Sequence, residues 1–290
     1  MTSGAGSETP ARRHQYSRNQ PSEDPDTVTK LRVCIAAALS IAALGAARPA
    51  AAQTDEIQVY TGGLADPHVF NLTLHNNFIA KGLTTPAFPG AVTADKSWNG
   101  VPEWAYGVTR WFEAGLYLPL YSRDNAQGWG LNGFKLRTLF AVPDADNRRF
   151  VYGSNFEFSF NANRWDTAGF TSEIRPIVGW HFTKVDIFIN PILDTAYDGF
   201  GNLDFAPSTR IAYNVSKTWA LALEEYGDFG PLKGFNPVSE QSHQLYGVFD
   251  WSGALDIEVG VGVGLTSASD KLTFKVILSR DLNKPRKATK

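Results

Sequence analysis

The sequence has little cysteine and no long apolar run, and each absence narrows what the chain can be. Its only cysteine, Cys34, lies in a segment that we expect to be removed. The mature chain then has no thiol for a disulfide bond or a metal site. A run of about 20 apolar residues, which a membrane-spanning helix needs, does not occur. The sequence therefore does not predict a helical membrane protein.

Charge is also scarce. Charged residues make up 19% of the 290 residues, and the formal net charge is -2. A soluble domain carries roughly 25%, and nucleic-acid binding needs a basic excess that this chain lacks. Aromatic residues are abundant at 13%. These values favour a chain that places aromatic surface against lipid.

The first 52 residues have the pattern of an export signal. Lys30 and Arg32 precede an apolar run, and Ala50 to Ala52 form a small-residue cleavage site. We predict that residues 30–52 are a secretory signal peptide cleaved after Ala52, because the run is too short for a membrane anchor. Residues 1–29 are expected to be a disordered extension or an overcalled start. Residues 53–67 are expected to form a periplasmic N-terminal segment.

The rest of the chain alternates apolar and polar residues with a period of two. In residues 255–265, Leu, Ile and Val occupy the odd positions, and Asp, Glu and Gly the even ones. Because successive strand side chains point to opposite faces, each such segment predicts a strand with one apolar and one polar face. Twelve strands are predicted, at residues 68–80, 100–109, 112–122, 129–142, 150–161, 170–182, 185–196, 207–216, 218–227, 242–251, 255–266 and 271–280.

These strands predict an all-β fold, a transmembrane antiparallel up-and-down β-barrel of about 12 strands over residues 68–282. Bacterial barrels have an even number of strands, short periplasmic turns and longer outer loops. The long connections at 81–99 and 228–241 alternate here with tight turns. A basic C-terminal tail follows at residues 283–290. Pro176 and Pro191 are expected at bulges or strand-end kinks, because proline removes a ladder donor.

A soluble β-sandwich or periplasmic barrel is the alternative fold, since its strands also alternate. The apolar face carries Phe, Trp or Tyr on nearly every strand, whereas the opposite face carries charges and glycines. Aromatic side chains in this number would overfill a closed core. We therefore expect the aromatic face to contact lipid and the charged face to line a lumen.

The polar face of the predicted strands supplies the candidate site. The functional interpretation is a polar conduit or ligand site, and the structural alternative is a network of salt bridges that fills a narrow lumen. The predicted lumen-lining residues are Glu113, Lys135, Arg137, Glu157, Glu173, Arg175, His181, Asp186, Asp194, Arg210, Glu224, Asp256, Glu258 and Lys275.

Catalytic motifs are weak in this sequence. No Gly-x-Ser-x-Gly motif occurs, and no glycine-rich phosphate loop opens a helix. A surface hydrolase that uses His243, with Ser239 or Ser242 nearby, is the least favoured hypothesis. We predict no catalytic residues, no metal site and no cofactor.

One hairpin resembles a known family. Residues 99–119 read NGVPEWAYGVTRWFEAGLYLP, a strand, a tight turn and a second strand that ends in Leu-Pro. This segment is similar to proteobacterial outer-membrane β-barrel proteins of the phenol-degradation meta-pathway family. The resemblance implies a channel or transporter, with hydrophobic or aromatic compounds among its solutes. One departure is Leu282, which stands where such barrels usually end in an aromatic residue.

The sequence thus predicts an outer-membrane barrel of a Gram-negative bacterium that lets a small solute cross passively. The alternative is a closed structural or binding barrel whose outer loops, 81–99 and 228–241, carry recognition. The expected partners are the lipid bilayer and lipopolysaccharide, the outer-membrane assembly machinery and a small-molecule solute, with no nucleic acid.

Overall fold

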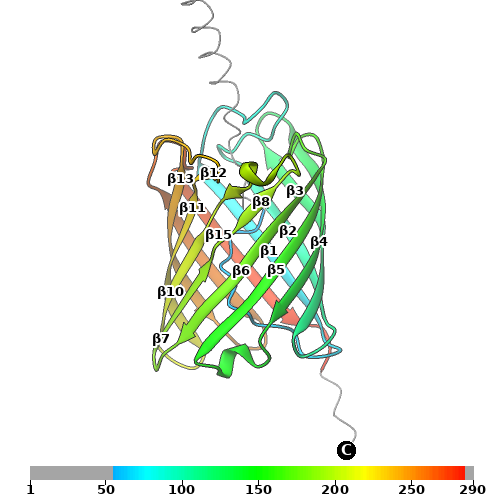
Figure 1. Cartoon of the computed structure of the whole chain (residues 1–290), viewed down its shortest axis with the longest axis vertical. Coiled ribbons are helices and arrows are strands. Elements are labelled where there is room, and N and C mark those ends of the chain that lie inside the picture. Colours follow the sequence, from blue (N-terminus) through cyan, green and yellow to red (C-terminus); the bar gives the residue numbers. More distant parts are fainter. Residues whose placement is uncertain (1–54, 285–290) are drawn as a thin grey trace, which may run out of the picture. The chain divides into compact units, whose positions relative to one another are not determined.

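Twelve antiparallel strands close into a barrel in the computed structural model, which describes residues 55–284 (Figure 1). Each strand pairs with its neighbour in sequence, and β1 pairs with β15. The pairing of β6 with β7 completes the ring. The barrel strands are β1 (Phe70–Lys81), β2 (Trp98–Gly107), β3 (Phe112–Asp124), β4 (Gly128–Ala141), β5 (Phe150–Asn161), β6 (Phe170–His181), β7 (Val185–Asn190), β10 (Ser208–Asn214), β11 (Trp219–Asp228), β13 (Ser242–Trp251), β14 (Asp256–Gly264) and β15 (Leu272–Asp281).

The predicted fold class is confirmed, and all twelve predicted strands are present. One of them, predicted at 185–196, is interrupted at Pro191 and resumes as β8 (Leu193–Thr195). Pro176 lies in β6 between Ile174, which pairs with β8, and Val178, which pairs with β7. The missing N–H of Pro176 therefore falls at the break in the neighbouring strand, where no ladder bond needs it.

The rim with the longer connections carries three short strands and one of two single-turn helices. Strand β8 pairs with β9 (Asp204–Phe205), which pairs with β12 (Gly230–Pro231). The 3-10 turn η2 (Phe200–Asn202) lies at this rim, and η1 (Ala145–Asn147) lies in a connection at the opposite rim (Figure 1). Within residues 55–284, no helix is long and apolar enough to cross a membrane.

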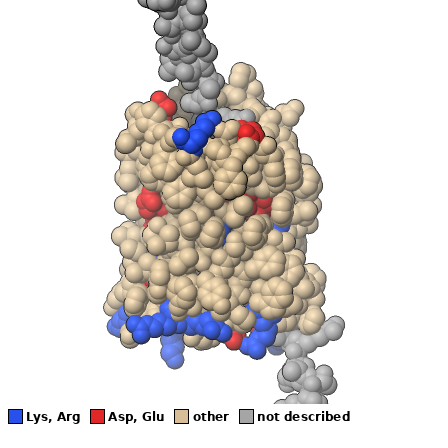
Figure 2. Space-filling model, in the orientation of Figure 1, with Lys and Arg blue, Asp and Glu red and all other residues tan. Residues whose placement is uncertain are grey.

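The outward face of the strands is apolar. Large side chains such as Leu136, Phe158 and Val261 are exposed on this face, as expected for a surface that contacts lipid. Tryptophans lie near the strand ends, where interfacial girdles form. Figure 2 shows few charged atoms across the middle of the visible face, and a row of Lys and Arg along the lower rim.

Strand β14 is rich in glycine because its inward side must accept large side chains from its neighbours. A Cβ on Gly260 would lie 2.8 Å from Cε of Lys275, and a Cβ on Gly262 would lie 2.3 Å from the ring of Tyr246. Real Cβ contacts are not this short, so only glycine leaves room for the buried lysine and tyrosine. The alternation of Val and Gly in β14 therefore has a packing cause.

The predicted disordered extension (1–29) and the signal peptide (30–52) lie outside the described residues, and so do the last six residues of the basic tail. At the C-terminal end of the barrel, β15 stops at Asp281, and the backbone N–H of Leu282 still donates to the carbonyl of Phe70 at 2.7 Å. Leu282 itself is exposed.

The lipid-facing surface can be tested by placing a charge on it. Val261→Arg, in the middle of β14, should lower the free energy of unfolding by about 2–4 kcal/mol, because arginine near the bilayer midplane is costly. The measurement is urea unfolding in lipid vesicles, followed by tryptophan fluorescence. Val238→Arg, in a long outer loop, is the matched control and should change the value by less than about 0.5 kcal/mol. Equal effects of both variants would contradict a lipid-facing β14.

Candidate functional site

The N-terminal segment, residues 55–62, lies inside the barrel. The sequence predicts a periplasmic location for this stretch, but the structure places Asp55, Glu56 and Tyr60 at 2%, 1% and 6% exposure, in contact with lumen side chains. The segment descends through the lumen to the rim where β1 begins, and Figure 1 shows part of it as the blue trace visible between the strands. The lumen therefore contains a stretch of the chain's own backbone.

One side of this segment packs against an apolar cluster inside the barrel. Ile57, Val59 and Tyr60 are buried there with inward side chains of several strands. Burial of a large apolar side chain contributes about 1.5–3 kcal/mol, so this packing stabilises the inserted position. The strand members of the cluster include Leu139, Val151, Ile177, Phe188, Ala212, Ala222, Tyr226, Tyr246 and Val248.

Polar side chains of four strands bond to the backbone of the segment, and a fifth strand bonds to Ala65, which follows it. Asn190 of β7 is bonded to both the N–H and the carbonyl of Tyr60, at 2.7 and 3.0 Å. Arg175 of β6 and Lys275 of β15 donate to the carbonyls of Gln58 and Ile57, each at 3.1 Å. The other two bonds run from Asn77 to the carbonyl of Asp55 and from the N–H of Ala65 to Glu113. Because buried backbone groups must be paired, these bonds specify the path of the segment.

The charged side chains between β1 and β6 form one connected network with the segment. Lys135 lies 2.7 Å from Asp55 and 3.3 Å from Glu157. Arg137 lies 2.8 Å from Glu103 and also pairs with Glu113. Although Arg137 and Glu157 are directly opposite in the strand register, each is paired with a different residue.

Arg175 forms the most buried part of this network. Its Nε lies 2.6 Å from Oε1 of Glu173, and its Nη1 lies 3.9 Å from Oε1 of Glu56. Glu157 and Glu173 are opposite each other on β5 and β6, and cations beside them, Lys135 and Arg175, offset the repulsion between the two carboxylates. A buried charge is tolerated only when it is paired in this way.

A second network lies between β10 and β15. Arg210 pairs with Glu224 and Asp250, and its Nη1 lies 3.4 Å from Glu258. Lys275 pairs with Glu224 and lies 2.6 Å from Glu258. Both networks reach the N-terminal segment, since Lys275 also donates to the Ile57 carbonyl.

Carboxylates outnumber cations in these lumen networks. Among the described residues, the lumen ion pairs join ten carboxylates to five Lys or Arg side chains and two histidines. The carboxylates are Asp55, Glu56, Glu103, Glu113, Glu157, Glu173, Asp186, Glu224, Asp250 and Glu258. The interior is therefore anionic in character.

The predicted lumen residues differ in burial. Seven are buried: Glu113, Arg137, Glu157, Arg175, Arg210, Glu224 and Lys275. Six are partly buried: Lys135, Glu173, His181, Asp186, Asp194 and Glu258. Asp256 is exposed at the start of β14, where its carboxylate accepts the N–H of Gly253 at 3.1 Å.

The sequence did not single out several residues of the same networks. Asp55 and Glu56 precede the barrel, so no strand pattern assigns them to the lumen. The alternation of polar and apolar residues could have identified His75, Glu103 and Asp250. These polar residues lie on the inward faces of β1, β2 and β13, respectively. Tyr117, whose hydroxyl lies 2.6 Å from that of Tyr60, carries no such signal.

Part of the lumen is a polar cavity of about 460 Å³ beside the N-terminal segment. It reaches the turns at residues 216–219 and 251–252, and Gln58, Val59 and Thr61 form one wall. Its charged lining residues are Asp146, His181, Asp186, Arg210, Lys217, Asp250, Asp256 and Glu258. A hydrated solute could occupy this space.

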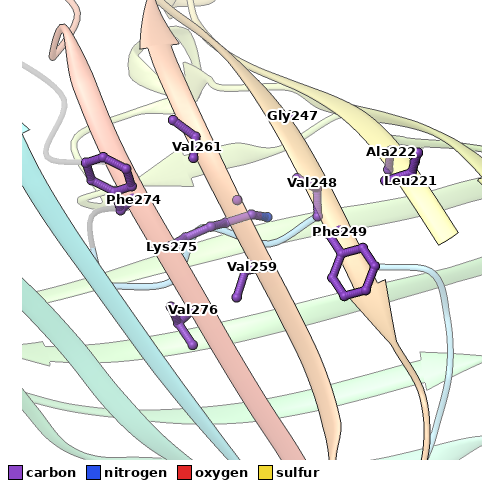
Figure 3. Close-up of a pocket in the computed structure, with 11 residues that line it drawn as sticks. Leu221, Ala222, Gly247, Val248, Phe249, Val259, Val261, Phe274, Lys275 and Val276 are labelled. Carbon is purple, nitrogen blue, oxygen red and sulfur yellow. The ribbon is translucent and has the colours of Figure 1, made fainter. Parts of the chain in front are cut away.

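The barrel wall has a hollow on its outer side at β11, β13, β14 and β15. Outward side chains such as Phe249, Val261 and Phe274 line it, around the bare backbone of Gly247. Figure 3 shows Lys275 running across beneath β14. The hollow is apolar, as lipid contact requires.

The first outer loop is tied to the rim by carboxylates. Asp95 accepts the N–H of Gly82 at 3.0 Å, and Asp270 accepts that of Leu83 at 2.9 Å. Burial is the largest influence on the Asp270 carboxyl and raises its pKa. Asp124 at the end of β3 accepts the N–H of Thr93 at 2.8 Å. The loop therefore has a defined position over the rim.

His243 lacks the partner that a serine hydrolase needs. Its Nδ1 lies 3.0 Å from Glu225 and its Nε2 lies 3.2 Å from Gln241. Ser269 bonds to the backbone N–H and carbonyl of His243 and not to its imidazole. Within residues 55–284, no serine hydroxyl is hydrogen-bonded to this imidazole, so the geometry does not support the hydrolase hypothesis.

Comparison with known proteins gives the fold. No known protein family and no curated protein matches the sequence. Among solved structures, an outer membrane channel from Pseudomonas putida F1 is similar with a TM-score of 0.54 and 10% identity, over 78% of this chain and 100% of that one. The likeness shows that the two chains share a β-barrel fold.

Two further structures are more distant. The CymD monoaromatic hydrocarbon channel has a TM-score of 0.46 and 9% identity, over 76% of this chain and 90% of that one. The KdgM porin in complex with disordered oligogalacturonate has a TM-score of 0.46 and 9% identity, over 73% of this chain and 99% of that one. No match to a family model supports the specific family that the 99–119 hairpin resembles.

The buried network can be tested at Arg175. Arg175→Met should lower the free energy of unfolding by about 3–5 kcal/mol, because it leaves the partly buried Glu173 and the buried Glu56 without their nearest cation. Arg110→Met is the matched control: Arg110 pairs with Asp144 at the exposed surface, and its loss should cost less than about 1 kcal/mol. Urea unfolding in detergent or vesicles measures both. A small effect at Arg175 would contradict a paired, buried guanidinium.

Proposed function

We propose that this protein is an outer-membrane channel through which small polar solutes cross passively, with a preference for cations. The observation that carries the proposal is the charged cavity between the N-terminal segment and the wall formed by β7 and β10 to β15. Rings of Asp and Glu favour cations in pores, and the lumen ion pairs contain twice as many carboxylates as Lys and Arg side chains.

The N-terminal segment narrows this pathway in our proposal. It occupies the lumen and is bonded by side chains of β1, β6, β7 and β15. The state seen here passes only small solutes beside the segment. Displacement of the segment would widen the lumen and leave its charged wall in place.

The location and partners follow from the same proposal. Export depends on the signal peptide and cleavage after Ala52, insertion depends on the assembly machinery, and the aromatic outer face contacts lipid and lipopolysaccharide. The hydrophobic or aromatic solutes implied by the hairpin resemblance are tested beside the polar ones, although the charged cavity favours the latter.

A closed binding barrel is the second candidate. Ion pairs and the N-terminal segment fill much of the lumen, and the first outer loop is held at the rim by Asp95, Asp124 and Asp270. In a closed barrel, recognition takes place on the outer loops, and no solute crosses the membrane through the lumen.

Conductance in planar bilayers separates these candidates. The mature chain should give small ion-conducting steps, and a chain without residues 53–62 should give steps several times larger, because the lumen loses its own backbone. A chain in which Gly and Ser replace residues 55–60 keeps the length, loses the contacts and should resemble the deletion. Silence from all three folded chains would reject the channel and favour the closed barrel.

Ion selectivity tests the acidic cavity. Reversal potentials under a KCl gradient should show that the wild-type chain prefers K⁺ to Cl⁻. Asp256→Asn should reduce this preference, because Asp256 is exposed in the cavity and its loss leaves no buried cation unpaired. Asp144→Asn, in an exposed pair outside the lumen lining, is the control and should leave the preference unchanged. An anion preference in the wild type would contradict the proposal.

A further inference from the structure

Three side chains that could bind a metal ion meet inside the barrel. Glu56 comes from the N-terminal segment, His75 from β1 and Glu103 from β2, and one nitrogen or oxygen from each lies within 4.8 Å of the others. All three are buried, at 1%, 1% and 6% exposure. The sequence analysis predicts no metal site, and the three residues carry no motif, since His75 and Glu103 are 28 positions apart and Glu56 precedes the barrel.

Two of these side chains have atoms without a hydrogen-bond partner. Neither carboxylate oxygen of Glu56 has one, and the nearest cation, Nη1 of Arg175, is 3.9 Å away. Nδ1 of His75 has no partner either. A buried carboxylate without hydrogen bonds is costly. A cation bound by Glu56 would supply the interaction that its carboxylate lacks.

The remaining contacts orient the other ligand atoms. Oε1 of Glu103 lies 2.8 Å from Arg137, and Oε2 of Glu103 lies 3.1 Å from Nε2 of His75. Arg137 thus holds one oxygen of Glu103 and leaves the other directed toward His75 and Glu56. Such outer contacts of a ligand are typical of metal sites, because they hold the carboxylate in the orientation that binding requires.

We propose that Glu56, His75 and Glu103 bind a divalent transition-metal ion of the Zn²⁺ type, and that the ion ties the N-terminal segment to the barrel wall. Zinc accepts imidazole and carboxylate ligands in tetrahedral sites, with ligand atoms about 3.4 Å apart for bonds of about 2.1 Å. The pair of His75 and Glu103 already has this spacing. Glu56, whose carboxylate accepts no hydrogen bond, lies within 4.8 Å of both and would need to move closer by on the order of 1.5 Å.

The donor set favours a transition metal over calcium. Ca²⁺ requires six to eight oxygen ligands, whereas this cluster offers two carboxylates and one imidazole. Three protein ligands leave a fourth position for water. The proposal goes beyond passage of solutes: the ion fixes the segment whether or not the barrel conducts.

Metal binding to the protein purified in detergent tests the proposal. After treatment with EDTA and removal of the chelator, the wild-type protein should bind one Zn²⁺ per chain, measured by competition with a chromogenic chelator. Glu56→Gln and His75→Gln should each weaken binding by at least about tenfold, since loss of an outer contact alone costs 10- to 100-fold. Ca²⁺ at the same concentration should not compete.

Asp55→Asn is the matched control. It removes a neighbouring carboxylate of the same segment, which pairs with Lys135 and is not a ligand, and it should bind Zn²⁺ as the wild type does. Heat-modifiable migration on gels shows for each variant that the barrel is folded. Should His75→Gln fail to fold, Glu56→Gln decides, because Glu56 lies outside every strand ladder. Absence of stoichiometric Zn²⁺ binding, or wild-type affinity in Glu56→Gln, would overturn the site.

A separate measurement tests whether the ion holds the N-terminal segment against the barrel wall. Thr61→Cys introduces the sole thiol of the predicted mature chain at a position that lines the polar cavity. Zn²⁺ should slow the reaction of this thiol with a maleimide, and the added change Glu56→Gln should abolish the slowing. Equal labelling rates with and without Zn²⁺ would show that the ion does not hold the segment. This outcome is independent of conductance, so it leaves the channel proposal to its own test.

Discussion

The structure depends on the pairing of charges that the barrel holds away from water. Twelve strands enclose a narrow space, and their inward faces place Arg137, Arg175, Arg210 and Lys275 almost fully inside it. An unpaired charge in such a place is unstable, so each cation is paired with carboxylates: Arg137, Arg210 and Lys275 with those of other strands, and Arg175 with Glu173 of its own strand and Glu56 of the N-terminal segment. The strand register brings these partners together, and the pairs in turn oppose any slip of the register, because a shift by one residue would move every charge to the lipid face.

The N-terminal segment is a bonded part of this interior. Arg175 and Lys275 each pair with a carboxylate of the wall and donate to a carbonyl of the segment. The same side chains therefore serve both the barrel and its contents. Asn190, bonded to the N–H and the carbonyl of Tyr60, provides the most specific contact, since only an extended backbone at that position satisfies both groups. A loosely held tail would not show this pattern of bonds.

The two faces of the wall have opposite requirements, and glycine reconciles them in β14. The outward positions are Val259, Val261 and Val263, which suit lipid. The inward positions are Gly260 and Gly262, because Lys275 and Tyr246 from the adjacent strands need the space. The wall is thin at this point, and an apolar hollow on one side lies close to a buried lysine on the other (Figure 3).

The sequence alone determined that the chain is a twelve-stranded barrel. It did so through the period of two, the short turns and the aromatic face, because side-chain direction in a strand depends on local geometry alone. The same alternation predicted the lysines and arginines of the inward face, and it could also have located His75 and Glu103, which the prediction did not include. It could not decide which charges pair: Arg137 is opposite Glu157 in the register but pairs with Glu103 and Glu113. Nor could it place Asp55, Glu56 and Tyr60 in the lumen, because this segment is not a strand of the sheet. Its position is set by bonds to four strands, β1, β6, β7 and β15, and only the closed barrel brings those strands around one space.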